Sequence, residues 1–287
     1  FMVLKIIPVV FSIITGLYLF SLRNYSIASM KWIGLSSSMP LVLYAASGFE
    51  AACSLSCQIK NAERNAPLAI FISYSIMITI AFLYQFFFYG AVGATLAEQS
   101  NYLGIFPLLL GILLPDSIHT VAIIQTIMYL AIASSALGSG YGILFSNPWN
   151  LYAMANNGHI WFKPFFTRLN SFGLPTLCIL TEGFLCLLYL CATQGDQLSL
   201  QQISALACSI VYTASVISLL VFVFVQRTVI IARWIPIFAL CNCLLLIASC
   251  IQSFLKSGIY SLVVFMCLLV VGIIMFFHTE QKQQKRA

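Results

Sequence analysis

Residues 40–67 read PLVLYAASGFEAACSLSCQIKNAERNAP, an apolar segment of membrane-spanning length that is interrupted near its middle and closed by a polar, basic turn. The interruption is Ser47-Gly48-Phe49-Glu50, which places a carboxyl group beside a glycine in an otherwise apolar span. A charged side chain at the centre of a bilayer costs about 2.5–3.5 kcal/mol on insertion scales, so a simple anchor would carry an apolar residue there. Irregular backbone at membrane depth is tolerated where it lines a polar cavity, which predicts a broken helix at a binding site.

The composition of the whole chain indicates a polytopic membrane protein. Of its 287 residues, 61% are hydrophobic and 7% are charged, whereas soluble domains carry about 25% charged residues. The net charge of +6 comes from 13 Lys and Arg residues scattered through short loops, which argues against a nucleic-acid-binding surface. The 10 cysteines lie almost entirely in apolar segments, without a CxxC pair or a histidine at metal-ligand spacing. We therefore expect them to pack between helices, and we expect no metal site and no cofactor.

Eight segments are long and apolar enough to cross a membrane as helices of about 20 residues. These predicted spans are residues 4–22, 38–59, 66–94, 117–146, 174–193, 201–225, 233–253 and 256–278. The shorter apolar segment 102–114 contains a proline and is predicted to be an external re-entrant or interfacial helix. Eight crossings place both chain ends on one side, and ten of the 13 Lys and Arg residues fall on that side. This asymmetry predicts that both termini are cytoplasmic.

The interrupted span also supplies the candidate binding residues. They are Tyr44, Ala45, Ala46, Ser47 and Gly48, a run of small residues with an aromatic at its start. Glycine adopts the backbone angles that an unwound turn requires, and such a turn exposes carbonyl and N–H groups that can bind an ammonium or a carboxylate. A packing seam of small residues between helices, with the acid of the span hydrogen-bonded to a neighbour, is the competing interpretation.

Two further sites in the predicted spans carry polar side chains. Ser134 and Ser135 form a pair of mid-membrane hydroxyls that could bind sodium, although hydroxyls in helices more commonly bond to their own backbone carbonyls. Glu182 lies mid-span beside Gly183, and an intramembrane acid is a functional candidate by default.

Two motifs resemble the amino acid–polyamine–organocation (APC) permeases. GFE at 48–50, KNAERNAP at 60–67 and the long apolar helix that follows are similar to the sixth span and next loop of that family, with Ala62 in place of a usual proline. LGSGYG at 137–142, followed by the LYAMANNG and FGLP sequences, resembles the eighth span and the loop before the ninth. Trp149 stands where the family usually has an arginine, so the ionic contacts of that loop are not expected here.

The resemblance implies an all-α transmembrane protein with a partial LeuT-type fold and a discontinuous second span. Residues 1–287 would form a single, N-terminally truncated permease domain that corresponds to spans five to twelve of the family. The implied function is secondary active transport of amino acids or related amines by alternating access, as a permease or antiporter and not as an enzyme. The expected partners are an amino acid or amine substrate, a coupling proton or sodium ion or a counter-substrate, and lipid. The expected location is a bacterial inner (plasma) membrane.

The resemblance also implies roles for individual residues. Tyr44 matches an aromatic that packs over the substrate, and the carbonyls of Tyr44 and Ser47 match groups that receive its ammonium. Glu50, next to Phe49, matches an acid linked to gating and proton coupling. Desolvation favours its neutral form, so both proton exchange and a structural hydrogen bond remain open for Glu50. Tyr141 lies near an aromatic gating position of the eighth span.

Two alternatives follow from the same alignment. The ninth span is peripheral in the resembling fold, which favours a structural, hydrogen-bonded role for Glu182. The chain could also be a non-transporting remnant or scaffold fragment of such a permease. An open frame upstream of Phe1 that encodes four more spans would favour the transporter, and a stop codon would favour the remnant.

Overall fold

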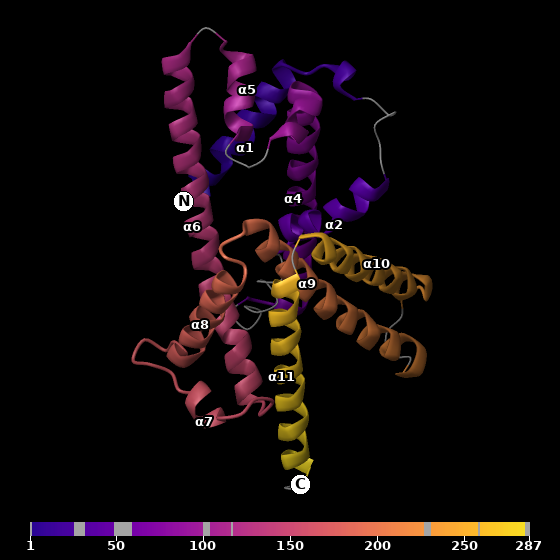
Figure 1. Ribbon diagram of the computed structural model, residues 1–287. Helices are drawn as coiled ribbons and strands as arrows, with labels where there is room; N and C mark the ends of the chain where they lie inside the picture. The colour runs from indigo at the N-terminus through magenta and orange to yellow at the C-terminus, as the bar shows by residue number, and fades with distance from the viewer. Residues whose placement is uncertain are drawn as a thin grey trace. The chain divides into compact units, whose positions relative to one another are not determined.

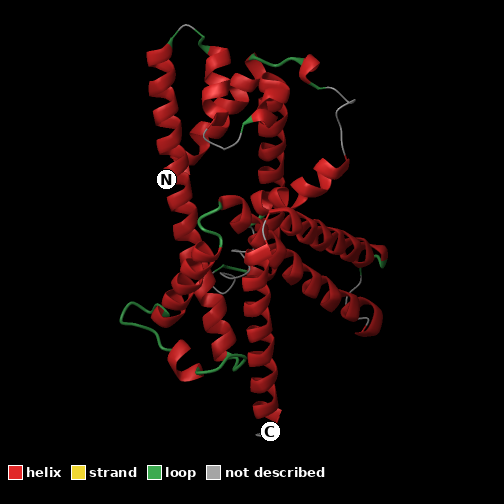
Figure 2. Cartoon of the chain, in the orientation of Figure 1, coloured by secondary structure: helices red, strands yellow, loops and turns green. Residues whose placement is uncertain are grey.

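The computed structural model describes residues 2–25, 32–48, 59–99, 104–115, 117–226, 231–257 and 259–284. Every regular element in these ranges is helical (Figure 2). Five helices are long and apolar enough to cross a membrane, and two shorter apolar helices accompany them. The prediction of an all-α transmembrane protein is therefore confirmed over the described residues.

The chain divides into two compact units, the first formed by residues 1–30 and 51–146 and the second by residues 31–50 and 147–287. The described helices of the first unit are α1 (Met2–Tyr18), the short 3-10 turns at Leu22–Asn24 and Gly93–Glu98, α4 (Ala62–Val92) and α5 (Ile105–Leu113). Those of the second are α2 (Trp32–Ala46), α7 (Lys163–Phe166), α8 (Thr176–Ala192), α9 (Gln197–Leu220, continued by a π-helical segment at Val221–Gln226), α10 (Trp234–Ser257) and α11 (Ile259–Gln284).

Helix α6 (Ile118–Asn156) runs through the predicted span 117–146 and continues without interruption through 147–156. Residues 118–146 belong to the first unit and the remainder to the second. Pro148 lies inside the continuing part, where it removes one backbone donor. Membrane helices tolerate such a proline because side chains and neighbouring helices satisfy the freed carbonyl.

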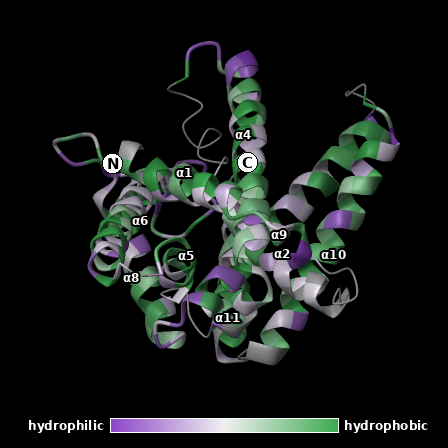
Figure 3. Ribbon diagram, turned by 90° about the horizontal axis from the view of Figure 1, so that it is seen from above, coloured by the Kyte–Doolittle hydropathy of each residue, from purple (hydrophilic) through white to green (hydrophobic). Residues whose placement is uncertain are grey.

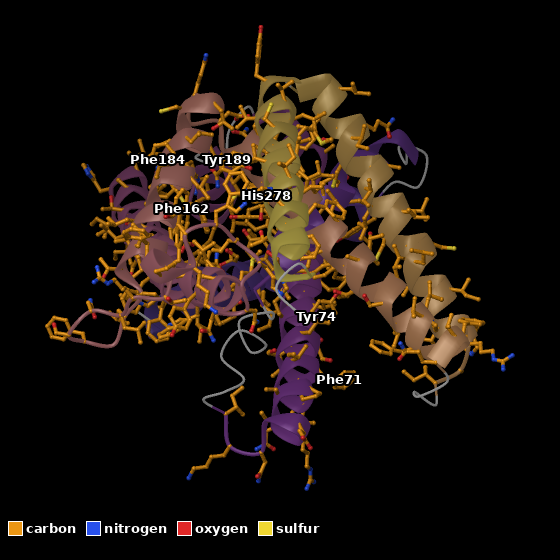
Figure 4. All side chains as sticks on the ribbon, turned by 90° about the horizontal axis from the view of Figure 1, so that it is seen from below. Phe71, Tyr74, Phe162, Phe184, Tyr189 and His278 are labelled. Carbon is orange, nitrogen blue, oxygen red and sulfur yellow. The ribbon has the colours of Figure 1, made fainter. Side chains whose placement is uncertain are left out.

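In the first unit, α1 packs directly on α4. A Cβ atom at Gly16 would lie 2.7 Å from the carbonyl oxygen of Phe87, so the two backbones approach too closely for any larger residue. The chain after α1 is then tied to the end of α4, because Asn24 Nδ2 donates to the Gly90 carbonyl at 2.6 Å. The Tyr25 hydroxyl donates to the Phe86 carbonyl in the same corner. Elsewhere the surface of α4 is apolar and exposed. Phe71, for example, projects away from the helix (Figure 4) and is 71% exposed.

In the second unit, α9 and α10 lie side by side and both contact α2 (Figure 1). Their shared core contains Leu206, Cys250 and Phe254, each 3% exposed or less. Across this interface Gln202 Nε2 donates to Ser253 Oγ at 2.7 Å, and both side chains are buried. Hydrophobic residues cover most of the remaining helix surface (Figure 3), as expected for helices that face lipid.

The end of α11 packs against the loop that follows α6. The His278 ring lies 5.5 Å from that of Trp161, and the Phe276 ring lies 5.5 Å from that of His159 (centroid distances). Thr279 also donates to the His159 carbonyl at 3.4 Å. These contacts account for two of the three histidines of the chain as packing residues near a helix end.

Candidate functional site

The candidate site begins where α2 ends. The α-helix stops at Ala46, inside the segment whose interruption the sequence predicts. Two donors of Ser47 turn back to the Tyr44 carbonyl, the backbone N–H at 3.2 Å and the hydroxyl at 2.7 Å. Gly48 then has a φ of +114°, a backbone conformation that residues with a side chain rarely adopt. The glycine is therefore the residue that allows the chain to leave the helix at this point.

The predicted binding residues differ in their exposure. Tyr44 is 41% exposed, Ala45 and Gly48 are also exposed, and Ala46 is buried at 9%. The two Ser47 donors occupy both lone pairs of the Tyr44 carbonyl, so this carbonyl accepts a ligand N–H only after Ser47 releases it. Phe49 and Glu50 lie outside the described residues, and the gating role of Glu50 stays a prediction.

The predicted cation site lies on α6, in the first unit, whereas the end of α2 belongs to the second. The hydroxyl of Ser134 is buried and has no hydrogen-bond partner among the described residues. The Ser135 carbonyl accepts a hydrogen bond from Ser139 at 2.9 Å. The common outcome for a helical hydroxyl, a bond to its own helix, therefore does not hold for Ser134. Tyr141, the predicted gating aromatic on the same helix, is 73% exposed.

Glu182 departs from the expectation of a satisfied structural carboxyl. Its Oε2 atom is buried and finds no hydrogen-bond partner within the part of the chain that the structure describes. The polar side chain that interacts with the Glu182 carboxyl is Asn147, on the continuing part of α6. Asn147 was not singled out from the sequence, although a polar residue directly before Pro148 near the end of an apolar span was the available signal.

No described group of His, Cys, Asp and Glu residues has the arrangement of a metal site. Two surface hollows on the described helices are shallow, and each lies on one helix. One is lined by Ala122, Ile123, Thr126 and Ile127 of α6, and the other by Ser75, Ile76, Thr79 and Ile80 of α4. Both lie away from the end of α2, where the candidate site is defined by the backbone break at Ser47 and Gly48.

Apolar helices and a helix that ends inside an apolar segment are features of an integral, multi-pass membrane transporter. The family model for amino acid permeases matches residues 1–286. Because this match covers nearly the whole chain, the protein belongs to the amino acid permease family. This family consists of transporters and not of enzymes, so the protein is a transporter of amino acids. The resemblance to the APC permeases is therefore confirmed. A comparison with curated proteins found no match.

Proposed function

We propose that this permease moves its amino acid by alternating access, and that the end of α2 forms part of the substrate site. The observation that carries the proposal is the helix end at Ala46, followed by Gly48 with a φ of +114°. Secondary transporters of related architecture bind substrates and ions at such discontinuous helices. The proposed location is a bacterial inner membrane with both chain ends in the cytoplasm.

The chemistry of a helix C-terminus suits the ammonium group of an amino acid. The last carbonyls of a helix lack intrahelical donors, and the helix dipole places partial negative charge there. In the proposed site the carbonyls of Tyr44 and Ser47 receive the ammonium, and the half-exposed Tyr44 ring covers the substrate. Release of Ser47 from the Tyr44 carbonyl would accompany binding, because Ser47 donates twice to that carbonyl.

The coupling of transport has two candidates. In a proton-coupled or exchange mechanism, Glu50 would gain and lose a proton as the cavity alternates between wet and closed states. In a sodium-coupled mechanism, Ser134 and Ser135 would supply hydroxyl ligands to the ion. The support for this mechanism is the buried Ser134 hydroxyl, which has no partner among the described residues.

The binding role is tested by uptake and exchange of labelled amino acids in proteoliposomes. Gly48→Ala is expected to lower transport about tenfold, because a side chain at this φ costs about 1–3 kcal/mol. Gly34→Ala is the matched control on α2, since a Cβ there would meet no atom within 4 Å. Equal transport by both variants would exclude the helix end as a binding element.

The coupling role is tested with the same vesicles. Glu50→Gln should alter the pH dependence of uptake, and an unaltered dependence would remove Glu50 from proton coupling. Uptake that persists when choline replaces sodium would remove the hydroxyl pair on α6 from sodium coupling.

A further inference from the structure

Glu182 is the seventh residue of α8, a helix of 17 residues with an otherwise apolar surface. Leu180, Phe184 and Leu187 around it are 63%, 65% and 61% exposed, as expected for a helix in lipid (Phe184 is labelled in Figure 4). Within this surface the Glu182 Oε2 atom is itself buried and without a partner among the described residues. An ionised carboxylate in that position would forgo the donors that normally compensate a buried charge.

The described surroundings of Glu182 offer no compensating cation. The polar side chain that interacts with it is the Asn147 carboxamide of α6. The titratable side chain that interacts with it electrostatically is the Cys186 thiol, one turn further along α8. Helix α7, which packs on α8, carries Lys163, but the Lys163 ammonium donates to the Asn156 carbonyl at 2.7 Å. Helix α11, which also packs on α8, contributes His278, whose ring lies against Trp161.

A carboxyl and a carboxamide form a complete pair only when the carboxyl is protonated. The protonated acid donates its O–H to the amide oxygen and accepts an amide N–H on its other oxygen. An ionised carboxylate and an amide oxygen are both acceptors, so the ionised form can use only the N–H and leaves one of its own oxygens unpaired. Glu182 has one such unpaired oxygen, Oε2, and the Asn147 carboxamide interacts with the same carboxyl group. A proton on this carboxyl would supply the missing donor and complete the pair.

We propose that Glu182 is a proton-binding site within the membrane, where the neutral carboxylic acid pairs with the Asn147 carboxamide and joins α8 to the end of α6. The site is separate from the break in α2 and does not depend on how the amino acid is bound. Its ligand is a proton, and loss of that proton breaks one of the two bonds that connect the helices.

Infrared difference spectroscopy on the full chain in lipid tests the protonation state without any transport measurement. The spectrum of the wild type minus that of Glu182→Gln, at neutral pH, should contain the C=O band of a protonated carboxyl and lack carboxylate bands. Carboxylate bands in that difference would overturn the proposal. Because Gln is a neutral isostere of the protonated acid, the variant is expected to remain monodisperse.

The partner is tested by substitution on α6. Asn147→Leu should shift the protonated-carboxyl band to higher frequency, because the acid loses its hydrogen-bond partner, whereas Asn150→Leu on the same helix should leave the band in place. An unshifted band in the Asn147 variant would overturn the pairing.

A hydrophobic carbodiimide gives an independent check, because it adds to protonated carboxyls in apolar surroundings and forms a stable N-acylurea without a leaving group. At neutral pH it should modify Glu182 and spare the exposed Glu63 at the start of α4. Modification of Glu182 only after acidification would show that it is ionised at neutral pH and would overturn the proposal.

Discussion

Asp196 and Glu182 carry carboxyl groups on consecutive helices of one compact unit, and the two groups differ in their hydrogen-bond partners. Asp196 is the N-cap of α9, and its carboxylate accepts the Ser199 backbone N–H at 3.0 Å and the Ser199 hydroxyl. The Ser199 hydroxyl, followed by the Ser199 N–H, lowers the pKa of Asp196 from its ordinary value. Glu182, inside α8, has one amide and a buried oxygen without a described partner. The chain thus places a hydrogen-bonded carboxylate at an exposed helix end and an incompletely paired carboxyl group inside an apolar helix.

The Gln202–Ser253 pair shows what a purely structural polar contact within the apolar helices looks like. Both side chains are neutral and buried, and the hydrogen bond between α9 and α10 measures 2.7 Å. A fold that needed only a polar link between α6 and α8 could use the same neutral pair. The acid at Glu182 adds a group that can change its charge, which a structural link does not require.

The largest effect on stability is expected at the structural pair. Gln202→Ala should lower the free energy of unfolding by about 2 kcal/mol, because an interhelical hydrogen bond worth up to about 1.7 kcal/mol is lost together with side-chain packing. Unfolding in mixed micelles by SDS titration measures this change. Gln201→Ala, at the less buried neighbouring position, is the control, and equal losses in the two variants would remove the pair from the stabilising contacts.

A smaller loss is expected at the helix cap. Asp196→Ala should lower the free energy of unfolding by about 1 kcal/mol, the usual value for removing an N-cap acceptor. Asp196→Asn retains an acceptor oxygen for Ser199 and should lose only the part that depends on charge, about 0.3–1 kcal/mol. If both variants were equally unstable, the charge and not the cap would be the source of the stability.

The charge-dependent part at Asp196 should vary with pH in a defined direction. The pKa of Asp196 is lower in the folded protein, so its charge stabilises the fold above the unfolded pKa of about 3.9. This contribution is lost as the pH falls through the lower, folded pKa. The difference in stability between wild type and Asp196→Asn should therefore be constant near neutral pH and disappear in acid. A difference that grew in acid would contradict this assignment.

The sequence alone predicted much of the fold but only part of the site. Hydropathy and segment length predicted the apolar helices, because a bilayer requires such helices to cross it. The Ser47-Gly48 interruption predicted the end of α2, because glycine permits the chain to leave the helix there. The continuation of α6 past Pro148 was not predicted, since a proline usually ends a helix in water but is tolerated in a membrane. The interaction of Asn147 with Glu182 was also missed: the polar residue before Pro148 is visible in the sequence, but which residue it contacts on another helix depends on packing.

The smallest effect should come from Glu182→Gln, within the span. If Glu182 is already neutral, Glu182→Gln exchanges one uncharged donor for another toward Asn147 and should leave the free energy of unfolding unchanged at neutral pH. Glu182→Leu removes both hydrogen bonds of the pair and should cost about 0.6–1.7 kcal/mol, which SDS titration resolves from zero. An ionised Glu182 with a cationic partner would give the opposite order. Gln would then leave that cation without its counter-charge, at a cost of about 3–5 kcal/mol. The sign of this comparison therefore separates a proton site from a buried ion pair.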